Sequence, residues 1–238
     1  MKVKKNWMLI SLILISFVAT IFVYGNLPSE IPRHWNIMGE VDGYWGKGNV
    51  FFTAFLPLAI YVLMMLLPKI DPKKSSYEMH KKAYSVTMFA ITLFLIVIHW
   101  VTIYASLGNS INVSVLVSGG VGILFVVLGN YMGQIRHNYF FGIRNPWTLA
   151  NEEVWAKTHR VGRYAFVLLG LIFIVSAFLP GPISAILIGV GIAILLFFST
   201  VYSYLLFRKT DKEKNKRIIK ENNGLWPMCY KDKMERFK

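Results

Sequence analysis

The sequence predicts an all-α membrane protein, a bundle of six transmembrane helices with both termini in the cytoplasm. Three observations predict it: an apolar composition, six long uncharged segments and an unequal distribution of basic residues. Of the 238 residues, 55% are hydrophobic and only 16% are charged, against about 25% charged in soluble domains. A soluble protein of this size would lack the charge to cover its surface. A single cysteine, Cys229, excludes a disulfide scaffold.

Six segments are long enough to cross the bilayer, since about 20 apolar residues span roughly 30 Å of hydrocarbon. Apart from Arg163 they contain no Asp, Glu, Lys or Arg, and they lack the polar stripe of a soluble helix. We therefore expect spans at Trp7–Gly25, Val50–Leu67, Tyr84–Leu107, Ile111–Met132, Val161–Leu179 and Pro182–Phe207.

The basic residues predict the orientation, because Lys and Arg are retained on the cytoplasmic side. Of the 26 Lys and Arg, all except Arg33 and Lys47 fall at the N-terminus, in the second and fourth connections or in the tail. These segments are expected inside, and the loop 26–49 outside.

The chain is expected to divide into three parts. Residues 1–110 form an N-terminal membrane module with three spans and the outer loop 26–49. Residues 111–207 form a second module with three spans and the cytoplasmic loop 133–162, and residues 208–238 form a basic tail. Small residues four apart, such as Ser118 and Gly122, or Ala185 and Gly189, let helix backbones approach closely.

The outer loop is expected to form a compact lid on the membrane. Its prolines are unfavourable for a regular helix, its glycines mark turns, and its aromatic residues are too apolar for a free linker. One histidine with two unphased acids, His34, Glu40 and Asp42, is too few ligands with recognisable spacing for a zinc site. We expect no metal, and instead ion pairs from these acids to Arg33 or Lys47.

The cytoplasmic loop 133–162 carries a helix start at Asn145-Pro146, and Glu152 and Glu153 suit the first turn of a following helix. Apolar and charged residues then alternate with helical spacing, which indicates an interfacial amphipathic helix leading into the fifth span. Two interpretations remain open: a membrane anchor, or a surface that recognises a peptide or a partner protein.

Residues 138–160, which end in Trp155-Ala-Lys-Thr-His-Arg, resemble the signature of the SdpI family, bacterial membrane proteins named for immunity to a sporulation-delaying toxin. The run 27–47, with Ile31-Pro-Arg-His-Trp-Asn, is similar to an uncharacterised module commonly found at the front of such proteins. Together they cover most of residues 20–180. Asn145 stands where the family pattern has Thr, and the basic tail is longer than compact members need.

The resemblance implies an integral membrane immunity and signalling protein of the bacterial cell membrane. It would protect the cell against a secreted antimicrobial peptide outside, and would capture a transcriptional repressor at the membrane inside. By this resemblance, the candidate outer sensing residues are Pro32, His34, Trp35, Asn36, Gly39, Asp42, Gly43 and Lys47. The candidate cytoplasmic signature comprises Asn138, Gly142, Arg144, Pro146, Trp147, Thr148, Trp155, Thr158, His159 and Arg160.

The sequence lacks phosphate-binding, zinc-protease, paired-cysteine and nucleophile-elbow motifs, so we expect no enzyme, no cofactor and no metal. No DNA-binding fold is recognisable, and the basic tail is expected to contact anionic lipid rather than nucleic acid. The alternative function is a small-molecule transporter or export protein. Two interpretations of the intramembrane His99 remain open: proton movement, as such a protein would need, or hydrogen bonding near the membrane interface. A membrane enzyme would need the group Arg144, Glu152, Glu153 and His159.

Overall fold

The computed structural model describes residues 6–36 and 38–235, with the side chains of Arg217 and of residues 220–235 outside the description. Lys2, Lys4 and Lys5, and the end of the tail from residue 236, also lie outside it, as does the side chain of Cys229. Within the described residues, six helices are long and apolar enough to cross a membrane, which confirms the six predicted spans. The protein is therefore a multi-pass membrane protein.

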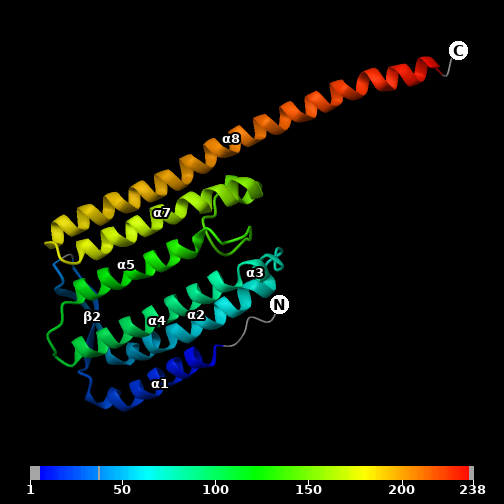
Figure 1. Cartoon of the computed structure of the whole chain (residues 1–238). Coiled ribbons are helices and arrows are strands. Elements are labelled where there is room, and N and C mark those ends of the chain that lie inside the picture. Colours follow the sequence, from blue (N-terminus) through cyan, green and yellow to red (C-terminus); the bar gives the residue numbers. More distant parts are fainter. Residues whose placement is uncertain (1–5, 37, 236–238) are drawn as a thin grey trace.

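The elements follow one another as α1 (Trp7–Val23), η1 (Tyr24–Asn26), β1 (Glu30–Trp35), β2 (Val41–Gly46), η2 (Lys47–Asn49), α2 (Val50–Ile70), α3 (Ser76–Met79), α4 (Lys81–Ser106), α5 (Val113–Met132), α6 (Pro146–Ala150), α7 (Glu152–Ser176) and α8 (Gly181–Glu235). The long helices lie side by side in the order α1, α2, α4, α5, α7, α8 (Figure 1). One end of the bundle carries β1 and β2 and is called the hairpin end. The opposite end, with α3 and α6, is called the loop end.

Two spans extend well beyond the bounds that the sequence predicts, whereas the other four differ from them by a few residues. The fifth begins at Glu152 instead of Val161, because Asn151 caps the helix and accepts hydrogen bonds from the backbone N–H groups of Glu153 and Val154. The predicted interfacial helix and the fifth span are thus one helix. The sixth continues beyond Phe207, since seven of the ten residues 208–217 are Lys, Glu or Arg, which are good helix formers.

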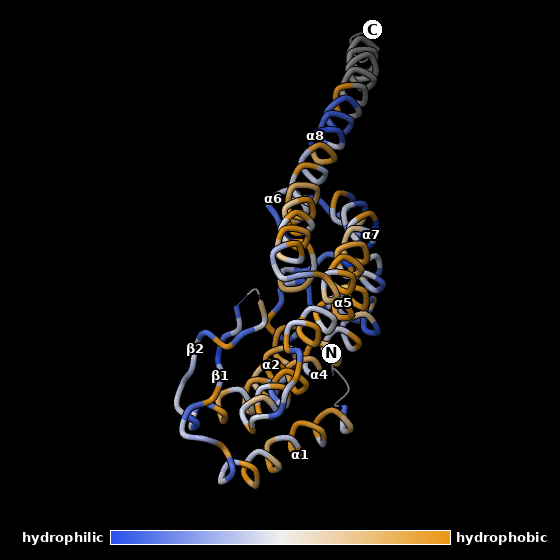
Figure 2. The backbone as a smooth tube through the Cα atoms, turned by 90° about the vertical axis from the view of Figure 1, so that its left-hand side faces the viewer, coloured by the Kyte–Doolittle hydropathy of each residue, from blue (hydrophilic) through white to orange (hydrophobic). Residues whose placement is uncertain are grey.

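The surface of the bundle is apolar where lipid would cover it. Large hydrophobic side chains stay exposed along the helices, for example Phe22 on α1, Phe55 on α2 and Phe197 on α8. Figure 2 shows α8 changing from hydrophobic to hydrophilic along its length, where it extends past its neighbours. Apolar side chains on the outside are what a helix in hydrocarbon requires, since no water surrounds it.

The helices α5 and α7 meet through glycines. A Cβ atom added at Gly122 would lie 2.6 Å from the backbone oxygen of Gly170, and one added at Gly170 would lie 2.6 Å from that of Gly122. This confirms the close packing expected at Gly122. Gly189 was the second position where close helix packing was expected, but a Cβ there would meet nothing within 4 Å. Gly191 instead lies against Leu169 and Ile172 of α7.

The first three spans pack through larger side chains. A buried cluster joins α1, α2 and α4 through Leu9, Tyr61 and Met88. The hydroxyl of Tyr84 on α4 donates to the backbone oxygen of Met64 on α2 at 2.6 Å. This oxygen lies in a helix that contains both Pro57 and Pro68. Since Pro68 has no N–H to donate to the Met64 carbonyl four residues earlier, the tyrosine supplies the missing hydrogen bond.

The glycine contact predicts that Gly122→Ala destabilises the protein, because the new methyl group meets backbone atoms that cannot move aside. We expect a loss of about 1–3 kcal/mol, as for other overpacked sites, seen as a lower thermal unfolding temperature of the purified protein in detergent. Gly119→Ala is the matched control on the same helix: its Cβ meets nothing within 4 Å. Equal unfolding temperatures for the two variants would contradict the role assigned to this contact.

Candidate functional site

The outer loop of the sequence forms a two-stranded antiparallel hairpin. Its register pairs Ile31 with Trp45 and Pro32 with Tyr44, and it shifts between Pro32 and His34, so that Arg33 is the extra residue of an irregular ladder. Ile31 is fully buried and packs with Val50 and other residues at the hairpin end. The strands are therefore anchored on the bundle by apolar side chains, with Pro32 buried beside Ile31 and Trp45 packed on the same cluster, while Arg33 and His34 stay exposed.

The turn of the hairpin is ordered by Asn36. Its side-chain oxygen accepts hydrogen bonds from the backbone N–H groups of Met38 at 2.8 Å and Glu40 at 3.1 Å, and its amide donates to the Glu40 carboxylate at 3.1 Å. Gly39 has a positive φ of 81°, which favours glycine. A Cβ there would also lie 2.7 Å from the hydroxyl of Ser114 at the start of α5. The turn thus rests against the second half of the chain.

The charged residues of the hairpin pair differently from the sequence expectation. His34 Nδ1 lies 2.5 Å from an oxygen of Asp42, and both side chains are exposed. Lys47 lies over the ring of Tyr24, with its Nζ 4.8 Å from the ring centre. Among the described residues, the expected ion pairs to Arg33 or Lys47 are not formed, because the strand register places His34 opposite Gly43, beside Asp42.

Below the hairpin, His99 joins three spans. It is almost completely buried, and its Nε2 lies 2.8 Å from the Thr20 hydroxyl on α1, while Nδ1 lies 2.9 Å from the Thr53 hydroxyl on α2. The neighbouring Trp100 donates from its indole N–H to the Ser16 hydroxyl at 2.8 Å. Both nitrogens of His99 therefore have partners, which favours the hydrogen-bonding interpretation of this residue over proton transfer.

At the loop end, Asn138 is the centre of the signature segment, by which we mean residues 133–162. The side chain is fully buried and makes five hydrogen bonds. Its amide donates to the carbonyls of Arg136 and Phe141, both at 2.9 Å, and its oxygen accepts from the backbone N–H groups of Phe140 and Phe141 and from the Tyr77 hydroxyl. Asn138 therefore fixes the path of the loop instead of facing solvent.

Asp71 ties this loop to the first half of the chain. Its carboxylate, 2% exposed, accepts from the Lys73 N–H at 2.7 Å, and from the Tyr77 hydroxyl and the Tyr139 N–H, each at 2.9 Å. Burial and this hydrogen bond raise the pKa of Tyr77 above its ordinary value, so the phenol stays protonated as a donor. Sequence reasoning missed Asp71; its only signal was an acid within a Lys-rich connection.

His80 lies beside this junction. Its Nδ1 accepts the backbone N–H of Arg136 at 3.2 Å, which ties the start of α4 to the signature segment. Burial, assisted by the Arg136 guanidinium and opposed by Asp71, lowers the pKa of His80 to about 4. The imidazole is therefore neutral at physiological pH, as its acceptor role requires.

Lys73 also connects the first half of the chain to the signature segment. Its ammonium group contacts His137 Nδ1 at 2.5 Å and forms an ion pair with the Glu152 carboxylate at the start of α7. Burial and this ammonium lower the pKa of His137. The His137 ring also meets Trp155 edge-on, with the ring centres 4.9 Å apart.

His159 is held in one tautomer by the backbone. Its Nε2 accepts the N–H of Ile143 at 2.9 Å, and its Nδ1 donates to the carbonyl of Trp155, one turn earlier on α7, at 2.9 Å. The ring stacks on Trp155 with the centres 4.1 Å apart. Gly142 has a φ of 115° and lies against this ring, so that any side chain there would collide with it. These three signature residues form one packed unit.

The start of α6 connects the signature segment to α8. Asn145 and Thr148 cap the helix reciprocally through side-chain to backbone hydrogen bonds, each of 3.0 Å. The amide of Asn145 also donates to the Ser203 hydroxyl on α8 at 2.8 Å. The amide of Asn145 thus ties the signature segment to α8. Trp147 adds a ring contact with Tyr204.

The structure thus separates the ten signature residues by burial. Asn138, Thr148, Trp155, Thr158 and His159 are buried, whereas Arg144, Pro146 and Arg160 are exposed. The face formed by Val154, Trp155 and Thr158 packs inside the protein rather than on the membrane surface, while the charged face stays exposed. In the described ranges, no group of three or more His, Cys, Asp or Glu could hold a metal ion.

Comparisons with known proteins find matches for the signature segment and for the part of the chain that contains the hairpin. Residues 134–203 match the SdpI/YfhL protein family, and residues 11–60 match a domain of unknown function, DUF1648. The chain is 28% identical to "Immunity protein SdpI" of Bacillus subtilis (strain 168) over 208 residues, which cover 87% of this chain and 98% of that protein. No solved structure gives a significant match. The resemblance to the SdpI family is therefore confirmed.

The burial of the signature predicts that Asn138→Ala lowers stability, because five polar partners lose their hydrogen bonds inside the protein. We expect a loss on the order of 3 kcal/mol, since each unsatisfied buried group costs about 1–3 kcal/mol. Thermal unfolding of the purified protein measures it. Arg160→Ala, at an exposed position of the same signature, is the control and should unfold at the wild-type temperature. If both variants unfold at that temperature, Asn138 does not hold the loop.

Proposed function

Because the chain resembles the SdpI family over most of its length, we propose that it is a membrane immunity protein, which protects its cell against a secreted antimicrobial peptide. The observation that carries this proposal is the similarity to "Immunity protein SdpI", because it extends over nearly the whole of that protein and leaves no large part of it unmatched. We propose that protection works by binding the peptide, without catalysis, in the cell membrane.

We also propose the orientation, with the loop end in the cytoplasm and the hairpin end outside. The charge distribution supports it: α2 and α4 are joined through Lys69, Lys73, Lys74, Lys81 and Lys82, and the signature segment adds further cations. The hairpin end has only Arg33 and Lys47. An anionic inner leaflet favours cations on the cytoplasmic side.

The hairpin is our candidate for sensing the peptide. Its exposed polar residues support this role, since His34 and Asp42 are held in place on strands that Ile31 anchors to the bundle. Rigid elements that present exposed polar and aromatic groups are typical of recognition sites. Trp35 and Asn36 belong to the same surface.

The signature segment is our candidate for transmitting the signal, and its exposed cations for contacting a transcriptional repressor. The hydrogen bonds of Asp71, His80 and Asn145 support transmission, because they join this segment to the first half of the chain and to α8. We divide the chain accordingly into the module 1–110, the module 111–207 and the basic tail from residue 208.

The orientation predicts the accessibility of single cysteines in intact cells. In a Cys229→Ser background, Met38→Cys at the hairpin turn should react with a membrane-impermeant maleimide added to the medium. Gln134→Cys at the loop end should react only after lysis, because the membrane shields the cytoplasm. Both positions are exposed in the protein. Labelling of Gln134→Cys in intact cells would reverse the proposed orientation.

The proposed function predicts that deletion of the gene sensitises the producing cell to an antimicrobial peptide of its own strain, and that the wild-type gene restores survival. The measurement is colony survival with and without the peptide-containing medium. Survival of the Gly119→Ala variant at the wild-type level is the control for expression. A deletion strain that grows equally well under every such condition contradicts the proposal.

A further inference from the structure

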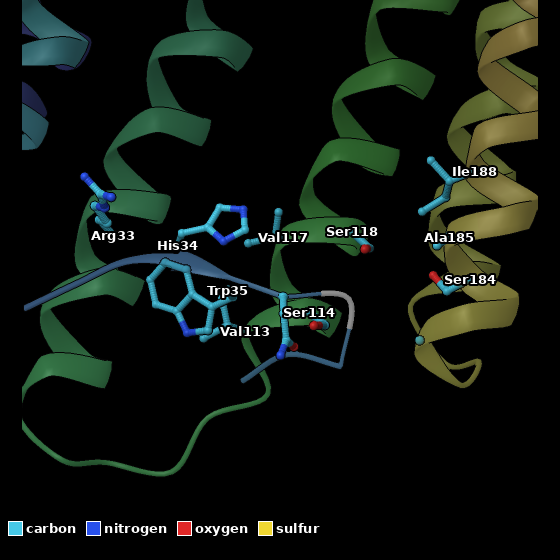
Figure 3. Close-up of a pocket in the computed structure, with 12 residues that line it drawn as sticks. Arg33, His34, Trp35, Val113, Ser114, Val117, Ser118, Ser184, Ala185 and Ile188 are labelled. Carbon is cyan, nitrogen blue, oxygen red and sulfur yellow. The ribbon is translucent and has the colours of Figure 1, made fainter. Parts of the chain in front are cut away.

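A cavity opens at the hairpin end, between the hairpin and the starts of two helices. Its volume is about 350 Å³, which lies in the lower part of the range typical of ligand sites. Figure 3 shows side chains of α5 and α8 facing each other across it, with His34 and Trp35 of β1 beside α5. The lining residues are Arg33, His34, Trp35, Asn36, Val113, Ser114, Val117, Ser118, Gly181, Ser184, Ala185 and Ile188.

The cavity combines parts of the chain that match different families. Its β1 wall lies within residues 11–60, and its α8 wall, from Gly181 to Ile188, lies within residues 134–203. The hairpin also touches α5 directly, since Gly39 packs against Ser114. Neither matched segment alone contains the site, so a ligand in the cavity contacts both halves of the protein at once.

The walls of the cavity are mainly apolar with a few hydroxyl groups. Val117 on α5 and Ala185 and Ile188 on α8 supply the apolar surface, and Ser118 and Ser184 add one hydroxyl each (Figure 3). Three consecutive residues of β1 and the following Asn36 also line it, so a ligand lies along the end of this strand. Such walls suit apolar side chains joined by a polar backbone, as in a peptide.

The charge of the cavity comes from one residue. Arg33 is the sole Lys or Arg that lines it, and it makes no hydrogen bond or ion pair with the described residues. His34 is already matched by Asp42. An unpaired guanidinium is complementary to a carboxylate, which it can bind through two parallel hydrogen bonds.

We propose that this cavity binds an apolar peptide segment that bears a carboxylate. Arg33 pairs with the carboxylate, and the surface of Val117, Ala185 and Ile188 receives the apolar side chains. This inference rests on the proposed immunity function and names the site and the chemistry through which the peptide is recognised.

An anionic lipid headgroup is the competing occupant, and the lining disfavours it. Sites for anionic headgroups are basic pockets with clustered cations, whereas this cavity has one cation beside hydroxyls and apolar side chains. The lining therefore favours the peptide, and bound lipid in the cavity would overturn the proposal.

The test measures binding of a fluorescein-labelled hexapeptide of valine and alanine to the full-length protein in nanodiscs of zwitterionic lipid, by fluorescence anisotropy. The peptide is used with a free C-terminal carboxylate and as its C-terminal amide. On the wild-type protein, the carboxylate form should bind about tenfold more tightly than the amide, as one charge-assisted hydrogen-bonded pair provides.

Two variants with matched controls locate the site. Arg33→Gln should weaken the carboxylate form to the level of the amide, while Lys74→Gln, the same charge change at the loop end, should not. Ile188→Trp should weaken both forms by filling the cavity, while Ile186→Trp, at an exposed position of α8, should not. Size-exclusion chromatography selects folded protein, and Arg33→Lys should retain part of the preference for the carboxylate.

Equal binding of both peptide forms to the wild-type protein, or no saturable binding, overturns the proposal. So does phosphatidylglycerol that co-purifies with the wild-type protein and not with Arg33→Gln, because the cavity then holds lipid.

The immunity function and the peptide site in the cavity can fail separately. If the wild-type gene protects cells and the genes with Arg33→Gln or Ile188→Trp protect equally well, this inference is wrong and the immunity function stands. If the wild-type gene gives no protection, the immunity function fails regardless of peptide binding.

Discussion

Helices in hydrocarbon gain little from the hydrophobic effect when they associate, so this bundle depends on close backbone contact and on hydrogen bonds between helices. The contact of Gly122 with Gly170 brings α5 and α7 together. His99 supplies the corresponding tie in the first half, through hydroxyls on α1 and α2. The halves are then joined at the loop end by the hydrogen bonds of Asp71. The glycine contact sets how closely the helices approach, and the hydrogen bonds fix their relative positions.

The two ends of the bundle are built in opposite ways. At the hairpin end, Ile31 and Pro32 are buried on a strand whose polar side chains face outward, and Arg33 makes no hydrogen bond or ion pair with the residues that the structure describes. At the loop end, polar side chains such as Asn138 are buried and hydrogen-bonded. We propose that the hairpin end, with its exposed polar groups, binds the ligand, and that the loop end transmits the displacement, because movement there must break several hydrogen bonds together.

Much of the fold was predictable because long apolar segments have one stable state in a bilayer, the helix. The glycine contact at Gly122 was predictable from the spacing of small residues, and Gly189, with the same spacing, makes no such contact. The hairpin was expected only as a compact lid, since prolines and glycines exclude a helix without specifying a register. The pairing of His34 with Asp42 follows from that register, and acids and cations in a loop sequence do not reveal it.

The sequence by itself determined the six spans, the resemblance to the SdpI family and the unequal division of the cations, because these follow from composition and from local order along the chain. Only the tertiary structure decided which candidate residues are buried and that β1, α5 and α8 enclose a cavity. It also decided that Asp71 and Thr53 form hydrogen bonds between distant parts of the chain. These depend on contacts between residues far apart in the chain, since a side chain's hydrogen-bond partner is set by the packing of another helix and not by its own neighbours.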